Sequence, residues 1–188
     1  MASRTQVVCL HEGKAGRSID PIFIRTLIKA IDPAWIRPWK GNNIIRSVDC
    51  GTRSQLIARM PDELRACLNA GGETTLMVWA DLDDDMEDGV QLRREFWNVA
   101  LLAGITREQF DQIVFAFAKD RLENWIEFLT LGNTDESAEG PRIKHGRQVA
   151  DAAKVLADRC TRQLVNPPLP PSLAWSCKNW RELVRRMS

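Results

Sequence analysis

The 188-residue sequence contains no tyrosine and only two histidines. The absence of tyrosine excludes, within this chain, any reaction that passes through a phosphotyrosyl link. No apolar run approaches the roughly 20 residues that a membrane-spanning helix needs. The six residues before the first apolar run leave no room for a signal peptide. We therefore expect a cytoplasmic protein without a membrane segment.

The cysteines are too scattered to suggest a metal cluster. None of them forms a CxxC pair, and two histidines add few further ligands, so the pattern disfavours a zinc site. We expect reduced and mostly buried thiols, as in cytoplasmic proteins. The five residues concerned are Cys9, Cys50, Cys67, Cys160 and Cys177.

Basic and acidic residues are almost balanced, with 26 basic and 25 acidic residues and a net charge of +1. Bulk charge therefore does not indicate a nucleic-acid partner, although local patches remain open. A hydrophobic content of 44% and this length suit one domain with a small appendage. We place an α/β domain at residues 1–130 and a helical C-terminal extension, packed on it, at 131–188.

Runs of β-forming residues alternate with helical apolar periodicity. The run "TTLMVWA" at 74–80 is nearly all apolar and predicts a strand buried on both faces. Connections too long for hairpins favour a mainly parallel sheet covered by helices on both faces, an α/β fold. The other strands are predicted at 6–10, 34–39 and 113–117. Helices are predicted at 20–31, 53–70 (with a break near Pro61), 90–102, 121–131, 144–164 and 175–187.

Two highly charged stretches, "HEGK" and "DLDDD", each follow directly on a predicted strand. Parallel strands bring their carboxyl ends to one edge of the sheet, so both stretches should open on the same rim. The second stretch places four carboxylates within five positions, at Asp81 and Asp83–Asp85. Such crowding is unfavourable unless a cation or a basic partner offsets the repulsion, and carboxylate oxygens suit Mg²⁺ or Mn²⁺. The alternative is a solvated acidic loop at the start of the next helix.

Several known site types do not fit the spacing. A calcium loop would need glycine and glutamate where Met86 and Leu92 stand. A phosphate-binding P-loop would need a hydroxyl residue after Gly13-Lys14, where the chain has Ala15. What remains is a strand ending in Glu12-Gly13 and a later strand ending in Asp81-Leu82-Asp83.

With this pair of motifs the chain resembles the TOPRIM fold, the metal-binding domain shared by topoisomerases, bacterial primases and the overcoming-lysogenization-defect nucleases. The resemblance covers residues 6 to 130. It extends to "FAKDRLENWIEFL", which is similar to the fourth strand and following helix of small stand-alone TOPRIM-like proteins from bacterial mobile and defence loci. A TOPRIM-like, Rossmannoid sheet is the implied fold.

The resemblance implies a metal site. Glu12 would be a catalytic acid or base, or a metal ligand. Asp81 and Asp83 would hold Mg²⁺ (or Mn²⁺), and Asp85 would be a further ligand. In the stand-alone relatives an acid recurs on the helix after the fourth strand, which makes Glu123 a catalytic candidate here, against the alternative of an ordinary surface glutamate.

The resemblance also implies contacts to phosphate. Gly13 would let the backbone approach a phosphate, because no Cβ stands in the way. Lys14, which is also a catalytic candidate, and Arg17 would steady the phosphate backbone. The basic stretch around Lys144 and His145 would grip phosphates, or else would form a solvated helix start.

Two further residues near the motif receive a structural interpretation. Related nuclease motifs carry an acid shortly after the Glu-Gly pair, but Asp20 stands at a longer spacing. Because Asp20 precedes Pro21, we interpret it first as the cap of a helix. His11 is interpreted as structural, on the opposite face of the strand from Glu12.

Three functions stay open at this point. The first is a metal-dependent nuclease-like subunit that acts on nucleic acid, with DNA favoured over RNA, in an anti-phage defence complex with an ATPase partner. The second is a non-catalytic assembly or regulatory subunit that keeps the fold. The third is a small-phosphoester hydrolase. A homo-oligomer is compatible with all three.

Overall fold

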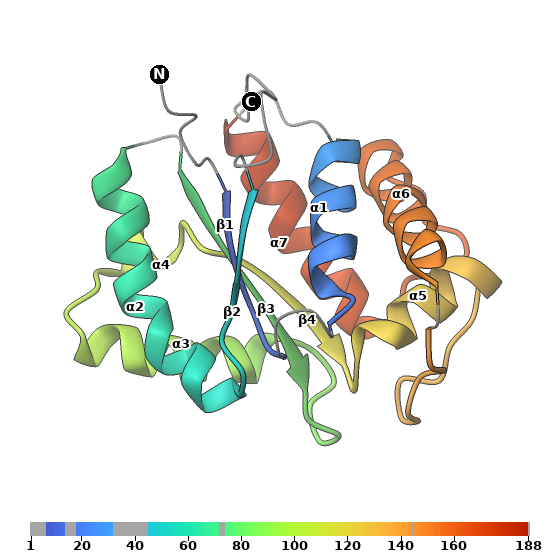
Figure 1. The fold of residues 1–188 in the computed structure, drawn as a ribbon, viewed down its shortest axis with the longest axis horizontal. Helices are drawn as coiled ribbons and strands as arrows, with labels where there is room; N and C mark the ends of the chain where they lie inside the picture. The colour runs from blue at the N-terminus through green and yellow to red at the C-terminus, as the bar shows by residue number, and fades with distance from the viewer. Residues whose placement is uncertain (1–6, 14–17, 32–44, 72–73, 144, 188) are drawn as a thin grey trace.

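The computed structural model describes residues 7–13, 18–31, 45–71, 74–143 and 145–187, with side chains described as far as residue 181. Over these residues the strands form one all-parallel sheet in the order β2-β1-β3-β4 (Figure 1). The expected α/β class is confirmed, and the arrangement is Rossmann-like. The strands are β1 (Val7–His11), β2 (Ile45–Asp49), β3 (Thr75–Leu82) and β4 (Val114–Lys119).

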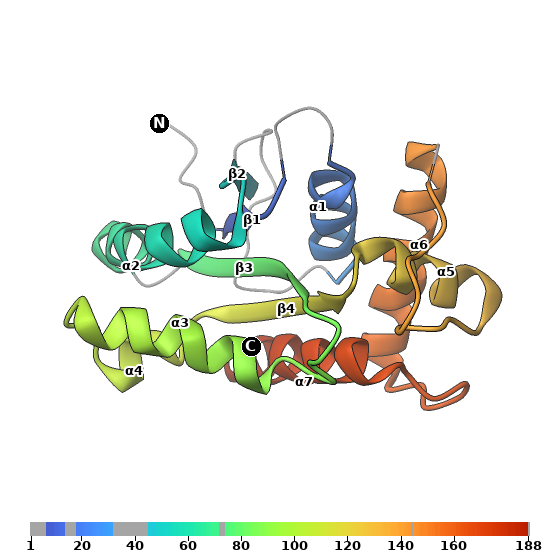
Figure 2. The same ribbon diagram turned by 90° about the horizontal axis from the view of Figure 1, so that it is seen from below.

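Helices cover both faces of the sheet, and each face has its own apolar core. On one face α1, α5, α6 and part of α7 pack together, and on the other face α2, α3 and α4 do so (Figures 1 and 2). The helices are α1 (Asp20–Ile31), α2 (Arg53–Ala70), α3 (Val90–Leu102), α4 (Arg107–Phe110), α5 (Leu122–Leu131), α6 (Gly146–Arg162) and α7 (Pro171–Met187).

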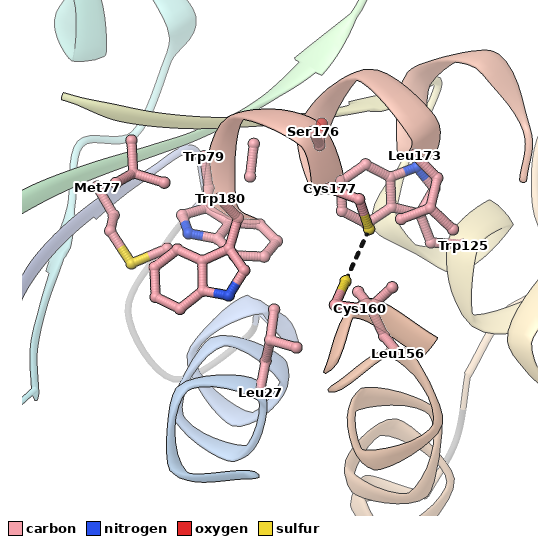
Figure 3. Close-up of a pocket in the computed structure, with 12 residues that line it drawn as sticks. Leu27, Met77, Trp79, Trp125, Leu156, Cys160, Leu173, Ser176, Cys177 and Trp180 are labelled. Carbon is pink, nitrogen blue, oxygen red and sulfur yellow. Dashed lines mark hydrogen bonds between the residues drawn. The ribbon is translucent and has the colours of Figure 1, made fainter. Parts of the chain in front are cut away.

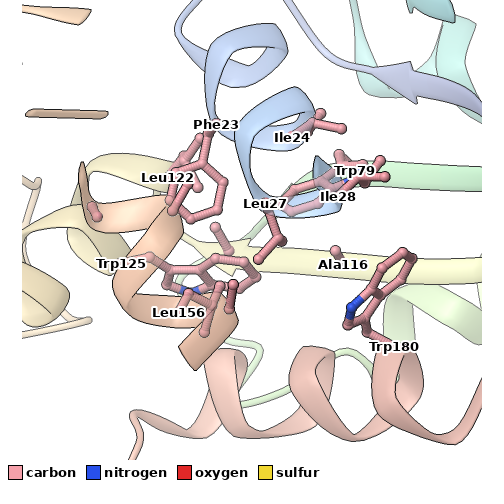
Figure 4. Close-up of a cluster of buried hydrophobic side chains, with 14 of the residues drawn as sticks. Phe23, Ile24, Leu27, Ile28, Trp79, Ala116, Leu122, Trp125, Leu156 and Trp180 are labelled. Atoms are coloured by element: carbon pink, nitrogen blue, oxygen red, sulfur yellow. The ribbon is translucent and has the colours of Figure 1, made fainter. Parts of the chain in front are cut away.

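The strand sequences explain this double core. In β3 the side chains of residues 75–80 are buried on both faces, as the run "TTLMVWA" predicts. On the α1 side, Trp79 lies edge-on between Phe23 and Trp125, with ring centroids 6.0 Å from each (Figure 4). Such edge-to-face pairs add about 0.5–1.5 kcal/mol beyond burial. This aromatic contact joins β3 to α1 and α5.

Local capping signals fix the starts of α2 and α4. Thr52 and Gln55 form a reciprocal capping box at the start of α2, and Thr106 and Gln109, whose spacing predicts one, form another at α4.

The break expected near Pro61 is wrong, since α2 is continuous. Pro61 is buried against the core, so packing outweighs the lost backbone hydrogen bond.

The edge strand β4 is covered by α7. The hydroxyl of Ser176 accepts a hydrogen bond from the Phe117 amide (2.9 Å) and donates one to the Phe117 carbonyl (3.3 Å). The hydroxyl of Ser172 accepts one from the Lys119 amide (3.2 Å). Two serines on a helix thus satisfy backbone groups that a further strand would otherwise pair, which protects the edge.

Helix α7 also contacts α6 through two thiols. Cys160 and Cys177 lie with their sulfurs 3.0 Å apart, beside an apolar cavity of about 20 Å³ (Figure 3). All five cysteines are buried and none forms a disulfide, which confirms the expectation of buried thiols.

Some boundaries differ from those that the sequence predicts. The strand predicted at 34–39 lies outside the described residues, whereas β2 at Ile45–Asp49 was not predicted. Helix α7 begins at Pro171, four positions before the predicted start at Trp175. Among the described residues, no helix combines the length and the apolar character needed to cross a bilayer.

Candidate active site

The two acidic motifs meet at the carboxyl ends of β1 and β3. These strands are neighbours, paired from Val7 with Thr75 to His11 with Trp79. The chain leaves β1 toward β2 on one side, while β3 and β4 lie on the other. Ligands of open α/β sheets bind at such a switch point, because the loops diverge there and leave a crevice.

Glu12, directly after β1, contacts the end of β3. Its Oε1 accepts a hydrogen bond from the backbone amide of Asp81 at 3.2 Å. Burial raises the pKa of Glu12 above its ordinary value, while Arg53 and the Asp81 amide pull it back down. The predicted meeting of the two turns is therefore present in the structure.

Asp81 is held in an environment that opposes its ionisation. Burial, followed by the nearby charges of Asp20, Glu12 and Glu123, raises the pKa of Asp81 to about 8. Burial likewise raises the pKa of Asp20 to about 6, against the favourable influence of His11. These four acids, called here the carboxylate cluster, repel one another, so a cation that entered between them would be strongly attracted.

The carboxylate cluster lines an open cleft of about 740 Å³. Besides the four acids, the cleft is lined by Gly13 from the β1 turn, by Arg121 at the start of α5 and by Arg142. Arg121 is paired with Glu139 at 2.6 Å, whereas Arg142 is exposed. A cleft with acids at its centre and arginines on its wall can hold a cation and the anion that the cation attracts.

Gly13 supports the cleft through its backbone. Its φ of 112° lies in the region that favours glycine, and its amide and carbonyl pair with those of Gly51 at 3.0 and 3.1 Å. A Cβ at Gly13 would lie 3.3 Å from the Cβ of Ser18. Only glycine therefore fits the turn without strain.

Arg53, the first residue of α2, connects the two motifs. Its guanidinium lies 2.5 Å from Oδ2 of Asp83, 2.5 Å from the carbonyl oxygen of Asp81, and 3.6 Å from Oε1 of Glu12. The gap between Glu12 and Asp83 is thus filled by a cation of the protein itself. A metal ion bridging these two side chains would have to displace it.

The structure brings some predicted site residues together and leaves others apart. Glu12, Gly13, Asp81 and Glu123 line the cleft. The side chain of Asp83 is 56% exposed and turned to Arg53, and Asp85 is exposed in the turn beyond β3.

The basic residues predicted to contact phosphate are less well placed. His145 is exposed at the start of α6 and is not among the residues that line the cleft. Lys14, Arg17 and Lys144 lie outside the described residues.

Sequence reasoning missed Arg53, favoured a helix cap for Asp20, and included Arg142 only in the basic stretch around Lys144 and His145. Asp20 is interpreted from sequence as a helix cap, but its carboxyl accepts a hydrogen bond from the Ser18 hydroxyl and faces the cleft, while its backbone amide donates to the Ser18 hydroxyl oxygen at 3.2 Å. The available signal was the acid expected after the Glu-Gly pair, at a longer spacing. Nothing local distinguishes Arg53 from other surface arginines.

The donor set suits a hard cation. Among the described residues, no group of three or more carboxylate, imidazole or thiol side chains is arranged so that it could hold one metal ion. Mg²⁺ does not require such a cage, because it usually keeps several waters and takes one or two carboxylates. Asp81, whose ionisation burial and its neighbours oppose, and Glu12, whose Oε1 lies 3.2 Å from the Asp81 amide, would be these two carboxylates. The residues present therefore fit Mg²⁺ or Mn²⁺.

Comparison of this chain with known proteins found no matching family model, no matching curated protein and no matching solved structure. Any assignment of function consequently depends on the geometry of the cleft and on the sequence motifs.

Proposed function

We propose that this chain is a TOPRIM-type nuclease subunit that hydrolyses phosphodiester bonds of nucleic acid with Mg²⁺ or Mn²⁺. The observation that carries the proposal is the convergence of Glu12 and Asp81, the two motif acids, in one cleft with Asp20 and Glu123. Four acids that oppose one another's ionisation either keep protons or are compensated by a cation that binds between them. Clustered perturbed carboxylates in a cleft are typical of catalytic sites.

Each residue of the cleft has a role in the proposed chemistry. Asp81 and Glu12 would hold the metal ion, which when bound supplies charge neutralisation at a phosphoryl oxygen. Asp20, with a pKa of about 6, exchanges a proton near neutral pH and suits general acid–base work beside the reacting phosphate. Arg142 would contact a phosphate from the wall of the cleft, and Gly13 would leave room for it.

The wider setting is proposed from the motif resemblance alone. It includes DNA rather than RNA as substrate, an ATPase partner, a role in anti-phage defence and a cytoplasmic location. The resemblance also leaves room for a homo-oligomer. The buried, disulfide-free cysteines are compatible with a reducing compartment.

One observation favours a second candidate, a non-catalytic assembly subunit. Arg53 already bridges Glu12 and Asp83, so part of the acidic rim is neutralised without a metal ion. In that case the acids would serve stability or recognition, and the cleft would bind metal weakly.

A cleavage assay separates these functions. Purified protein is incubated with supercoiled plasmid and with single-stranded DNA and RNA, in Mg²⁺, in Mn²⁺ and in EDTA. We expect metal-dependent cutting that falls at least about 100-fold in Glu12→Gln and Asp81→Asn. Asp84→Asn, an equal change of charge at an exposed neighbour, is the matched control.

The alternatives give different results. Absence of cutting together with no rise of melting temperature on adding metal would favour the assembly subunit. Turnover of a small phosphoester with DNA left intact would favour a phosphatase.

A further inference from the structure

A second recess lies away from the carboxylate cleft, where α3, α4 and α7 come together. Figure 2 shows α3 and α7 next to each other along β4, and the recess between them has a volume of about 580 Å³. This volume falls within the range of about 300–1,000 Å³ that ligand sites occupy. The side chains that define it, called here the basic groove, are Arg93, Arg94, Trp97, Arg107, Trp175 and Lys178.

The basic groove concentrates positive charge in a chain of net charge +1. Its lining includes four cationic side chains and no carboxylate. Arg93 and Arg107 share one acid outside the lining, Asp111, at 2.6 and 3.1 Å. Arg94 and Lys178 are exposed and have no ion-pair partner among the side chains that the structure describes. The groove therefore carries an excess of positive charge that an anionic ligand would neutralise.

Aromatic rings fix the two paired arginines in place. The guanidinium of Arg93 lies 5.1 Å from the ring centre of Phe110, and that of Arg107 lies 5.1 Å from the ring centre of Trp97. The Nε of Arg93 is buried and has no hydrogen-bond partner. Planar guanidinium groups held in this way are suited to phosphate oxygens, and they lose little entropy on binding.

The far wall is equally rigid. The indole of Trp175 stacks on Phe117 with centroids 5.3 Å apart and an interplanar angle of 11°. The indole also packs against Gly89, where any Cβ would lie 2.3 Å from the ring. Half-buried Trp175 and Trp97 therefore form preformed apolar walls between the cations.

We propose that the basic groove binds a single strand of nucleic acid through its phosphates, at a site separate from the carboxylate cleft. The inference rests on the proposed function, since it gives the nuclease a second hold on its substrate. Alternating cations and indoles are typical of grooves that follow a single strand. An acidic peptide would also pair with the guanidinium groups, whose geometry matches carboxylate as well as phosphate. Its acidic side chains would not stack on the indoles of Trp97 and Trp175, whereas the bases of a single strand would.

The test is fluorescence anisotropy with a labelled oligothymidylate single strand, measured in EDTA so that no divalent ion can bind the cleft. For Arg94→Gln/Lys178→Gln we expect binding weaker by on the order of tenfold, and a log–log salt slope smaller by about 1.4. Lys154→Gln/Arg162→Gln on α6, which removes the same charge from exposed positions, is the control and should bind like the unaltered chain.

Three outcomes would overturn the proposal: wild-type binding by the groove variant, an equal loss in the α6 control, or binding of polyglutamate without binding of oligothymidylate. Circular dichroism melts confirm that both variants are folded. Failure here is distinguishable from failure of the proposed function. Glu12→Gln abolishes metal-dependent cutting only if the cleft is catalytic, and it leaves binding in EDTA unchanged if the groove is the second site.

Discussion

Two groups of acids, the carboxylate cluster and the acidic turn, are separated by only one residue between Asp81 and Asp83, yet they differ in burial and in charge partners. Asp81 is half-buried beside other carboxylates, and the pKa of its carboxyl is raised to about 8. The acidic turn, Asp83–Asp85, is exposed, and its first member is neutralised by Arg53. The acids are densest along the sequence in the turn, yet the raised carboxyl pKa values are those of Asp81 and Asp20 in the cluster. Burial and convergence, not composition, make the candidate site.

The largest expected effect is on the pH dependence of stability. The folded chain keeps protons on Asp81 and Asp20 above the ordinary pKa of aspartate, which the unfolded chain does not. The contribution of these two groups to the free energy of unfolding is therefore most favourable below about pH 4. It falls as pH rises toward 8, by at most about 1.4 kcal/mol per pH unit for each proton. Asp81→Asn should flatten this fall in thermal melts between pH 5 and 9.

Asp84→Asn is the control for that experiment, and its melting curve should shift with pH as the unaltered chain does. Parallel pH profiles for Asp81→Asn and the unaltered chain would show that burial and the neighbouring carboxylates do not keep Asp81 protonated.

A second prediction contrasts the acid missed from sequence with the one predicted. Asp20→Asn should weaken Mn²⁺ binding, measured by calorimetry, by about 10–100-fold, because Asp20 belongs to the carboxylate cluster. Asp83→Asn should change it far less, since its partner is Arg53. The reverse order would place the metal ion in the turn and return the site to the motif as the sequence predicts it.

A third prediction concerns the cation between the two groups. Arg53→Ala should lower the free energy of unfolding by about 1 kcal/mol, because its ion pairs are partly exposed. It should also raise the pKa of Glu12, which Arg53 now lowers. Carbon-detected NMR titration of the Glu12 carboxyl measures the shift, with Arg46→Ala, an arginine paired to Glu63, as control. An unchanged Glu12 titration would mean that Arg53 does not govern this carboxylate.

The smallest effects belong to the turn itself. Asp84→Asn and Asp85→Asn should each change the free energy of unfolding by less than about 0.5 kcal/mol, as exposed substitutions usually do. Chemical denaturation measures this directly. A loss well above 1 kcal/mol from either one would show that the turn is structured by a partner or ion of its own.

Much of the fold follows from local sequence. The apolar run of β3 and the alternation of strands and helices predict a parallel sheet, and the sheet then brings Glu12 and Asp81 to one rim. The capping box at Thr106 and Gln109 could be recognised because its two residues stand three apart. These features depend on residues that are close together along the chain, so they can be predicted from a single sequence.

Other features could not be predicted because their causes lie far away in the chain. Strand β2 reads "IRSVD", with only Ile45 and Val48 buried, and this pattern is too weak to identify a strand. Arg53 matters through contacts with residues about 30 and 40 positions distant, which no local pattern encodes. Asp20 carries two signals, of which the helix cap is the commoner. Packing decides between them.

The most direct test of the central claim is a crystal of the chain soaked in Mn²⁺, with the metal ion located by anomalous diffraction. Our account predicts one peak within coordination distance of the carboxylates of Glu12 and Asp81, with Asp20 beside it and water completing the shell. A peak confined to Asp83–Asp85, or no peak in the cleft at saturating Mn²⁺, would contradict it.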